Sequence, residues 1–69
     1  MKTYIQYKYS YTYKREGAIC VGTKYSWLPP ENQELVLTGI RIFFRNAIIT
    51  DICEHRKADA NGKTIPSNS

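Results

Sequence analysis

The chain has 69 residues, of which 42% are hydrophobic and 23% are charged. This length and composition predict one globular domain and exclude a multidomain protein and a disordered chain. Ten Lys and Arg against six Asp and Glu give a net charge of +4, which favours acidic partners such as nucleic acid or an acidic protein surface. Polar residues interrupt every apolar run well before the roughly 18 residues of a membrane span, so no membrane contact is expected.

Residues 3–14 alternate between large apolar and polar side chains, which predicts a long strand. Polar side chains, Lys8 and Lys14 among them, occupy one face. The rings on the opposite face are expected to cover the core, and the alternatives are an aromatic surface for a partner or a platform for stacked bases. The side chains on this second face are Ile5, Tyr7, Tyr9, Tyr11 and Tyr13.

The turn after this strand is predicted to be a three-residue hairpin loop, a type I turn that Gly17 closes in the left-handed conformation. The second strand then runs over residues 18–27. This loop pairs Lys8 with Lys24 across the hairpin and gathers the large apolar residues of both strands on one face. From the second strand, the expected core residues are Ile19, Val21, Tyr25 and Trp27.

Two prolines end the second strand, and a short helix is predicted over residues 30–38. Pro30 suits the first helical position, since its missing N–H would have no partner there in any case. Glu31 and Glu34 lie near the positive end of the helix dipole, and Gly39 follows the last turn.

Residues 40–53 are rich in β-branched and aromatic side chains, which predicts one or two further strands around a turn at residues 45–46. This turn pairs Ile42 with either Ile49 or Ile48, depending on the loop length. The apolar pattern fits both registers equally well and leaves them open.

Together these elements predict an α+β domain: an N-terminal β-hairpin, a short helix, and one or two more strands in an antiparallel sheet of three or four. A small SH3-like β-barrel is the alternative. Residues 1–57 are expected to form a single compact domain. Residues 58–69 are expected to form a polar, mobile C-terminal tail, because Ile65 is the only large apolar side chain in the last ten residues.

The residue spacings typical of metal sites and catalytic centres are missing. Asp51, Cys53 and His55 alternate as if to line one side of a strand, but no second cluster completes a metal site, and nothing orients a Cys–His pair for nucleophilic attack. We therefore expect no metal, no cofactor and no enzymatic activity. Cys20 and Cys53 are too few for a disulfide framework, which favours a cytoplasmic protein and leaves a single bridge between them open.

Without a catalytic signature, the sequence favours a small non-catalytic protein-interaction module or inhibitor that binds a larger partner protein. The alternative is a nucleic-acid-binding protein that uses a basic sheet face. A homodimer through the free edge of the first strand also fits a domain of this size. Neighbouring side chains on a strand point in opposite directions, so one of two adjacent phenylalanines is expected to face outward if the second hairpin buries one side only. A sheet with both faces covered, one of them by the short helix, is the alternative. The candidate partner- or anion-binding residues are Tyr4, Lys8, Lys14, Arg15, Lys24, Phe43 and Phe44.

Overall fold

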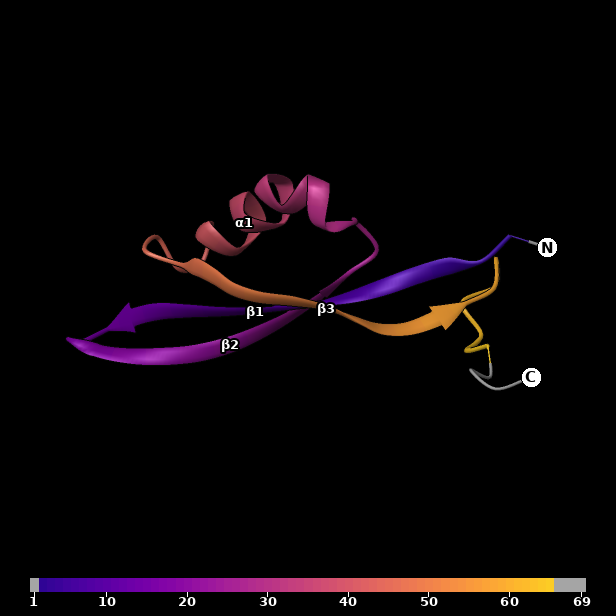
Figure 1. The fold of residues 1–69 in the computed structure, drawn as a ribbon. Coiled ribbons are helices and arrows are strands. Elements are labelled where there is room, and N and C mark those ends of the chain that lie inside the picture. Colours follow the sequence, from indigo (N-terminus) through magenta and orange to yellow (C-terminus); the bar gives the residue numbers. More distant parts are fainter. Residues whose placement is uncertain (1, 66–69) are drawn as a thin grey trace.

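The structure, a computed structural model, describes residues 2–65 (Figure 1). The described chain is elongated, with principal extents of 47 × 20 × 18 Å. Its elements in chain order are β1 (Tyr4–Arg15), β2 (Ala18–Ser26), the 3-10 helix η1 (Pro30–Asn32), α1 (Gln33–Arg41) and β3 (Ile48–Ala58).

The strands form one antiparallel sheet in the order β2-β1-β3, and α1 packs against one of its faces (Figure 1). A three-stranded antiparallel sheet with one short helix fits the predicted α+β class. The SH3-like barrel is wrong, because the described sheet stays open, with β2 at one edge and β3 at the other. The predicted free edge of the first strand is wrong too, because β1 is the central strand and is paired on both sides.

The hairpin turn is tighter than predicted. Glu16 and Gly17 both have positive φ values, 52° and 82°, which is the geometry of a two-residue type I′ turn. Arg15, and not Lys14, therefore faces Ala18 across the hairpin. The three-residue loop was predicted because residues other than Gly, Asn and Asp rarely adopt the left-handed conformation, and glutamate at position 16 was not expected to do so.

This shift of one residue exchanges the two faces of β2, because successive side chains on a strand point to opposite sides. Lys24 lies opposite Tyr9, on the side that α1 packs against, which we call the covered face. Tyr25 lies opposite Lys8 on the other side, which we call the open face. The predicted Lys8–Lys24 pair therefore does not form. The residues of β2 that were expected in the core but lie on the open face are Ile19, Val21 and Tyr25.

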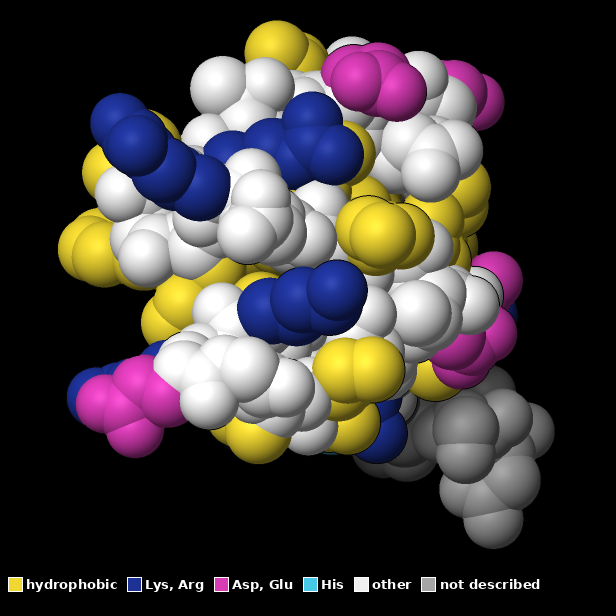
Figure 2. All heavy atoms as spheres, turned by 90° about the vertical axis from the view of Figure 1, so that its left-hand side faces the viewer, with side chains coloured by type: hydrophobic (Ala, Val, Ile, Leu, Met, Phe, Trp, Pro, Cys, Tyr) yellow, Lys and Arg dark blue, Asp and Glu magenta, His cyan; other side chains and the backbone are white. Residues whose placement is uncertain are grey.

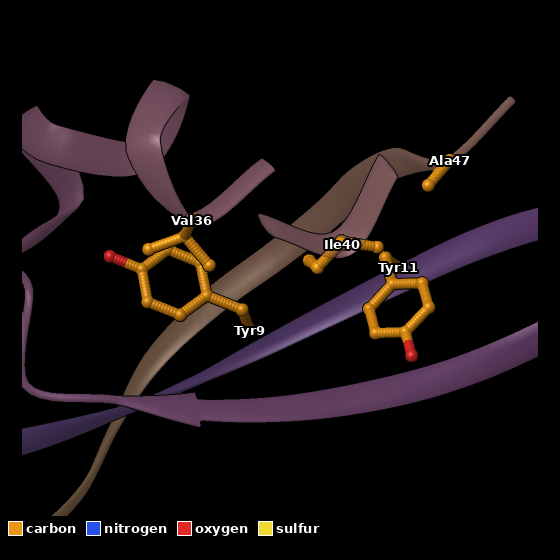
Figure 3. Packing of buried hydrophobic residues seen from close by; sticks show 5 residues of the cluster. All are labelled: Tyr9, Tyr11, Val36, Ile40 and Ala47. Carbon is orange, nitrogen blue, oxygen red and sulfur yellow. The ribbon is translucent and has the colours of Figure 1, made fainter. Parts of the chain in front are cut away.

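The core lies on the covered face, between the rings of β1 and the helix α1 (Figure 3). Tyr9 is fully buried and Tyr11 is buried beside it, which confirms that the rings of the first strand cover a core. Val36 and Ile40 lie one helical turn apart and reach these rings from α1, and Ala47 joins the cluster from the segment before β3. Half-buried side chains packed around it are Tyr7, Tyr13, Leu37, Phe44, Ile49 and Ile52.

Two contacts hold the central rings in place. The Tyr9 hydroxyl donates a hydrogen bond of 2.6 Å to the Leu28 carbonyl oxygen. Desolvation by burial also raises the pKa of Tyr9 above its ordinary value of 10.0. The Tyr11 ring lies over Gly22 on the neighbouring strand, where a Cβ would come within 2.6 Å of the ring atom Cε2. The absence of a side chain at position 22 thus makes room for the tyrosine ring.

The helical segment ends later than predicted, and the second hairpin does not form. α1 continues to Arg41, and the backbone N–H groups of Phe43 and Phe44 donate to the Ile40 carbonyl oxygen at 3.1 and 3.0 Å. Ile40 is buried against the rings of β1 because the helix extends this far. Residues 42–47 form a loop, so both predicted strand registers in this region are wrong.

The last strand is longer than predicted as well. β3 runs past Cys53 to Ala58 and pairs with β1 through two irregularities in register. β3 is an edge strand, and the second half of it consists mostly of exposed polar residues. The apolar pattern there is therefore too weak to predict a strand.

The chain turns back after β3. Ala58 is fully buried and forms an isolated bridge with Thr64. The Asp59 carboxylate accepts the backbone N–H groups of Asn61 and Lys63 at 2.9 and 3.0 Å, which organises the turn. These contacts belong to the first part of the predicted tail. Its last four residues lie outside the described residues, and the mobility of the tail stays a prediction.

Candidate partner-binding surface

The open face carries three exposed aliphatic side chains, Ile19, Val21 and Ile48, which we call the aliphatic patch. They are 71%, 74% and 59% exposed, respectively. Val21 and Ile48 both pair with Thr12, one from each side. Val21, Thr12 and Ile48 therefore form a row across the sheet. Ile19 precedes Val21 by two positions on the same strand and therefore points to the same side. Aliphatic side chains gathered on one uncovered face are typical of an interaction surface.

Lysines stand at both ends of this patch along β1. Lys14 pairs with Ile19, and Lys8 pairs with Tyr25 on one side and Cys53 on the other. Asp51, opposite Ser10, is an acidic residue on the same face. The open face therefore combines an apolar centre with a basic rim that one carboxylate interrupts.

The surface beside the patch is hollow and basic, at the end of the sheet that holds the hairpin turn. A cavity of about 730 Å³ lies there, and Figure 2, which looks onto this end, shows Lys and Arg side chains among hydrophobic ones. The Nε atom of Arg41 donates a hydrogen bond of 3.1 Å to the Ala47 carbonyl oxygen, which orients its guanidinium group. The residues that line this cavity are Thr12, Tyr13, Lys14, Ile19, Arg41, Arg45, Asn46 and Ile48.

A second hollow of about 370 Å³ adjoins the first, and we call the two the hairpin-end pockets. Phe43 lines it and is 80% exposed, while the Phe44 ring is half-buried and stacks on Tyr13 with 4.0 Å between ring centroids. Arg15 adds another cation to this wall. The residues that line both pockets are Tyr13, Lys14, Arg45 and Asn46.

Four of the predicted binding residues meet at these pockets: Lys14, Arg15, Phe43 and Phe44 line the smaller one. Phe43 faces outward, but the expected reason is wrong, because both rings belong to the loop after α1 and not to a strand of a second hairpin. That these residues bind a partner stays a prediction.

The other three predicted residues lie apart from the hairpin-end pockets. Lys8 is on the open face and Lys24 is on the covered side, so the structure separates them. Tyr4 lines a different hollow, of about 410 Å³, together with Trp27 and the turn after β3. The expected basic sheet face therefore keeps Lys8 and Lys14 but loses Lys24.

Sequence reasoning missed Arg41 and Arg45. It assigned Arg41 to a strand, whereas the residue ends α1 and is held by the loop that follows. The signal available in the sequence was weak: the two arginines are four positions apart, but nothing in the local pattern relates them to Lys14. Only the packing of the helix on the sheet brings them to one cavity.

At the opposite end of the sheet, the cationic side chain of Arg56 makes contacts within the protein. The Arg56 guanidinium lies 5.2 Å from the centre of the Trp27 ring, and its Nε atom donates to the Gln6 side chain at 2.9 Å. Its Nη1 atom donates to the Gly62 carbonyl and the Thr64 hydroxyl oxygens, each at 3.1 Å. Trp27, expected in the core, is exposed beside this arginine.

The cysteines and the histidine are not assembled into a reactive site. Cys20 and Cys53 are free thiols; Cys20 pairs with Tyr13 on the covered side, and Cys53 lies on the open face. The His55 ring contacts Tyr25, with 4.5 Å between ring centroids. Among residues 2–65, no three His, Cys, Asp or Glu side chains come close enough together to hold a metal ion.

Within the same described residues, no helix has the length and apolar character needed to cross a membrane. Comparison of the chain with protein-family models, with curated proteins and with solved structures gives no match.

Proposed function

We propose that this protein is a non-catalytic interaction module whose open face binds a larger partner protein with an acidic surface. The observation that carries the proposal is the aliphatic patch: Ile19, Val21 and Ile48 are exposed together on a sheet face that the helix leaves uncovered. Burying such side chains against a partner gains about 25 cal/mol per Å² of apolar surface.

The charge around the patch supports an acidic partner. Lys8 and Lys14 lie on the same face as the aliphatic side chains, and the net charge of the chain is +4. A partner surface with carboxylates around an apolar centre would be steered toward this face and held in register by the lysines.

The register favours a protein partner over nucleic acid on this sheet. The tyrosine rings that could have stacked on bases cover the core, and Lys24 lies on the other side from Lys8 and Lys14. The aliphatic side chains between Lys8 and Lys14, Val21 and Ile48, have no planar surface for a base to stack on. The Tyr25 ring on this face lies beside Lys8 and contacts His55.

The test is affinity capture from a cell extract with four baits: the wild-type chain, an Ile19→Ser/Val21→Ser variant, a Leu35→Ser control and a Lys8→Glu/Lys14→Glu variant. Leu35 is exposed on α1, away from the open face. We expect an acidic protein that wild type and the Leu35 control retain and the other two baits lose. Calorimetry with the purified partner then gives the affinity for each bait. Equal retention by the Ile19→Ser/Val21→Ser bait would show that the patch is not the interface.

A further inference from the structure

We infer that the hairpin-end pockets form a binding site for a nucleotide, with its phosphate held by Lys14, Arg41 and Arg45 and its base against the ring of Phe43. This inference goes beyond the proposed function and does not depend on it. Lys14, Ile19 and Ile48 belong to both surfaces, but the nucleotide contacts invoked here come from the cations and Phe43, and Val21 and Lys8 of the partner surface lie outside both pockets.

The larger pocket has the size and the charge for the phosphate end. Its volume of about 730 Å³ lies within the roughly 300–1,000 Å³ of typical ligand sites. Lys14, Arg41 and Arg45 line it, and its lining holds no acidic side chain. Arginine matches phosphate oxygens with two parallel N–H donors, and lysine adds a point charge.

The orientation of Arg41 strengthens this assignment. Its Nε atom is bonded to the Ala47 carbonyl oxygen at 3.1 Å, and Ala47 itself is fully buried. This bond restrains the guanidinium group through Nε alone, so the N–H donors of both Nη groups are not used by it, and Arg41 lines the pocket. A donor held in this way loses little conformational entropy when it binds an anion.

The smaller pocket has the aromatic surface for the base. Phe43 lines it with most of its ring in solvent, and the stacked pair of Tyr13 and Phe44 forms the wall beside it. A planar base can stack on an exposed ring whatever its identity. Asn46 lines both pockets and offers an amide to the sugar or the base edge.

The shared wall links the two halves of the ligand. Lys14 and Arg45 line both hollows, so a phosphate bound between them has its ester oxygen near the aromatic pocket. A free nucleotide and a nucleotide within a single strand share this chemistry, and the experiment distinguishes them.

The first measurement is a titration of the ¹⁵N-labelled protein with adenosine monophosphate, inorganic phosphate and phosphotyrosine, followed by amide chemical shifts. We expect adenosine monophosphate to shift the amides of residues 12–15 and 41–48 and to bind at least about 10-fold more tightly than inorganic phosphate, because stacking adds to the anion contacts. Equal affinity for inorganic phosphate, or tighter binding of phosphotyrosine, would overturn the nucleotide assignment.

Two pairs of variants assign the residues. Lys14→Gln/Arg45→Gln is expected to weaken nucleotide binding about 10-fold or more, whereas Lys24→Gln/Lys63→Gln, which removes the same charge outside both pockets, changes it less than about 2-fold. Phe43→Ala is expected to weaken it about 5-fold or more, with inorganic phosphate binding unchanged and Leu35→Ala as the exposed apolar control. Losses that are equal in the two charge variants would mean a general electrostatic effect and no site.

A labelled single-stranded oligothymidylate, measured by fluorescence anisotropy, separates the two sources. If adenosine monophosphate displaces it at similar concentration, the site takes the free nucleotide; if the strand binds far more tightly with the same variant pattern, the site takes a nucleotide within a strand. Val21→Ser lies outside both pockets and should leave all of these affinities unchanged, even where it abolishes partner capture. Absence of binding by both probes would overturn the inference and leave the proposed function untouched.

Discussion

The covered and open faces of the sheet are built from alternate residues of the same strands, yet they differ in almost every physical property. The covered face holds fully buried Tyr9 and the other rings under α1, while the open face exposes Ile19 and Val21 to solvent. On β1 this difference follows from the sequence alone, since aromatic and polar residues alternate along the strand. On β2 it follows from the turn, because a loop of another length would reverse the faces of that strand. A face of a sheet is thus set by its partner strands as much as by its own sequence.

The largest effect on this comparison is expected from removing the central ring. Tyr9→Ala should lower the free energy of unfolding by about 3–5 kcal/mol, because it opens a cavity under α1 and deletes a buried hydrogen-bond donor. Tyr25→Ala, the same change on the open face, should lower it by less than about 1 kcal/mol. Denaturant unfolding of the two variants checks the difference. Similar losses would contradict the assignment of the faces.

A smaller loss is expected from a methyl group under the second buried ring. Gly22→Ala should destabilise the protein by about 1–3 kcal/mol, because its Cβ would overlap the Tyr11 ring. Gly39→Ala is the matched control: position 39 lies within α1 with open space around it, so the change should stabilise the protein by about 0.5–1 kcal/mol. Opposite shifts in the thermal midpoint are expected, and shifts of the same sign would show that the Tyr11 ring does not occupy this space.

The buried hydroxyl should make stability depend on alkaline pH. Burial raises the pKa of Tyr9 in the folded protein, so the unfolded chain loses this proton first as the pH rises past about 10. The associated stability is fully present below pH 10 and is lost as the pH approaches the folded-state pKa. Tyr9→Phe should remove this part of the decline and cost about 1 kcal/mol at neutral pH through the lost bond to Leu28. Denaturant unfolding of both proteins between pH 8 and pH 11 checks this. If the free energy of unfolding of Tyr9→Phe falls as steeply with pH as that of the wild type, the pH dependence belongs to other groups.

The smallest expected effect tests the turn that decides the register. Glu16→Asn should stabilise the protein by about 0.5–1 kcal/mol, because residue 16 has a positive φ and asparagine adopts this conformation more readily than glutamate. Glu16→Gln removes the same charge without the conformational gain and serves as the control. In the three-residue loop that the sequence suggested, position 16 has a negative φ, and the two variants would unfold alike.

Sequence patterns predicted the parts of the fold that depend on local chemistry. The alternation of β1 located the core face, and Pro29 and Pro30 located the end of the second strand and the start of the helical segment. Prediction failed where a residue takes a conformation that its type disfavours, as Glu16 does. It failed again at residues 40–44, where Ile40 and Arg41 continue the helix and residues 42–44 form a loop, because burial of Ile40 outweighs local strand propensity.

The candidate sites show the same division. The sequence marked Lys14, Arg15 and the pair Phe43 and Phe44 as binding residues by their type, and these side chains do meet in one pocket. It could not supply the arginines of α1 and the following loop, because their approach to the sheet depends on how the helix packs.

The amino-acid sequence by itself determined that this chain has a long amphipathic first strand with an aromatic core face, a helix after the two prolines, and a basic surface. Those features follow from side-chain alternation and backbone restriction, which act within a few residues. Only the tertiary structure decided that Ile19 and Val21 face solvent and that Arg41 and Arg45 join Lys14 around a cavity. Both outcomes depend on contacts between segments far apart in the chain, where a turn of two residues and the burial of one helix face outweigh the local pattern.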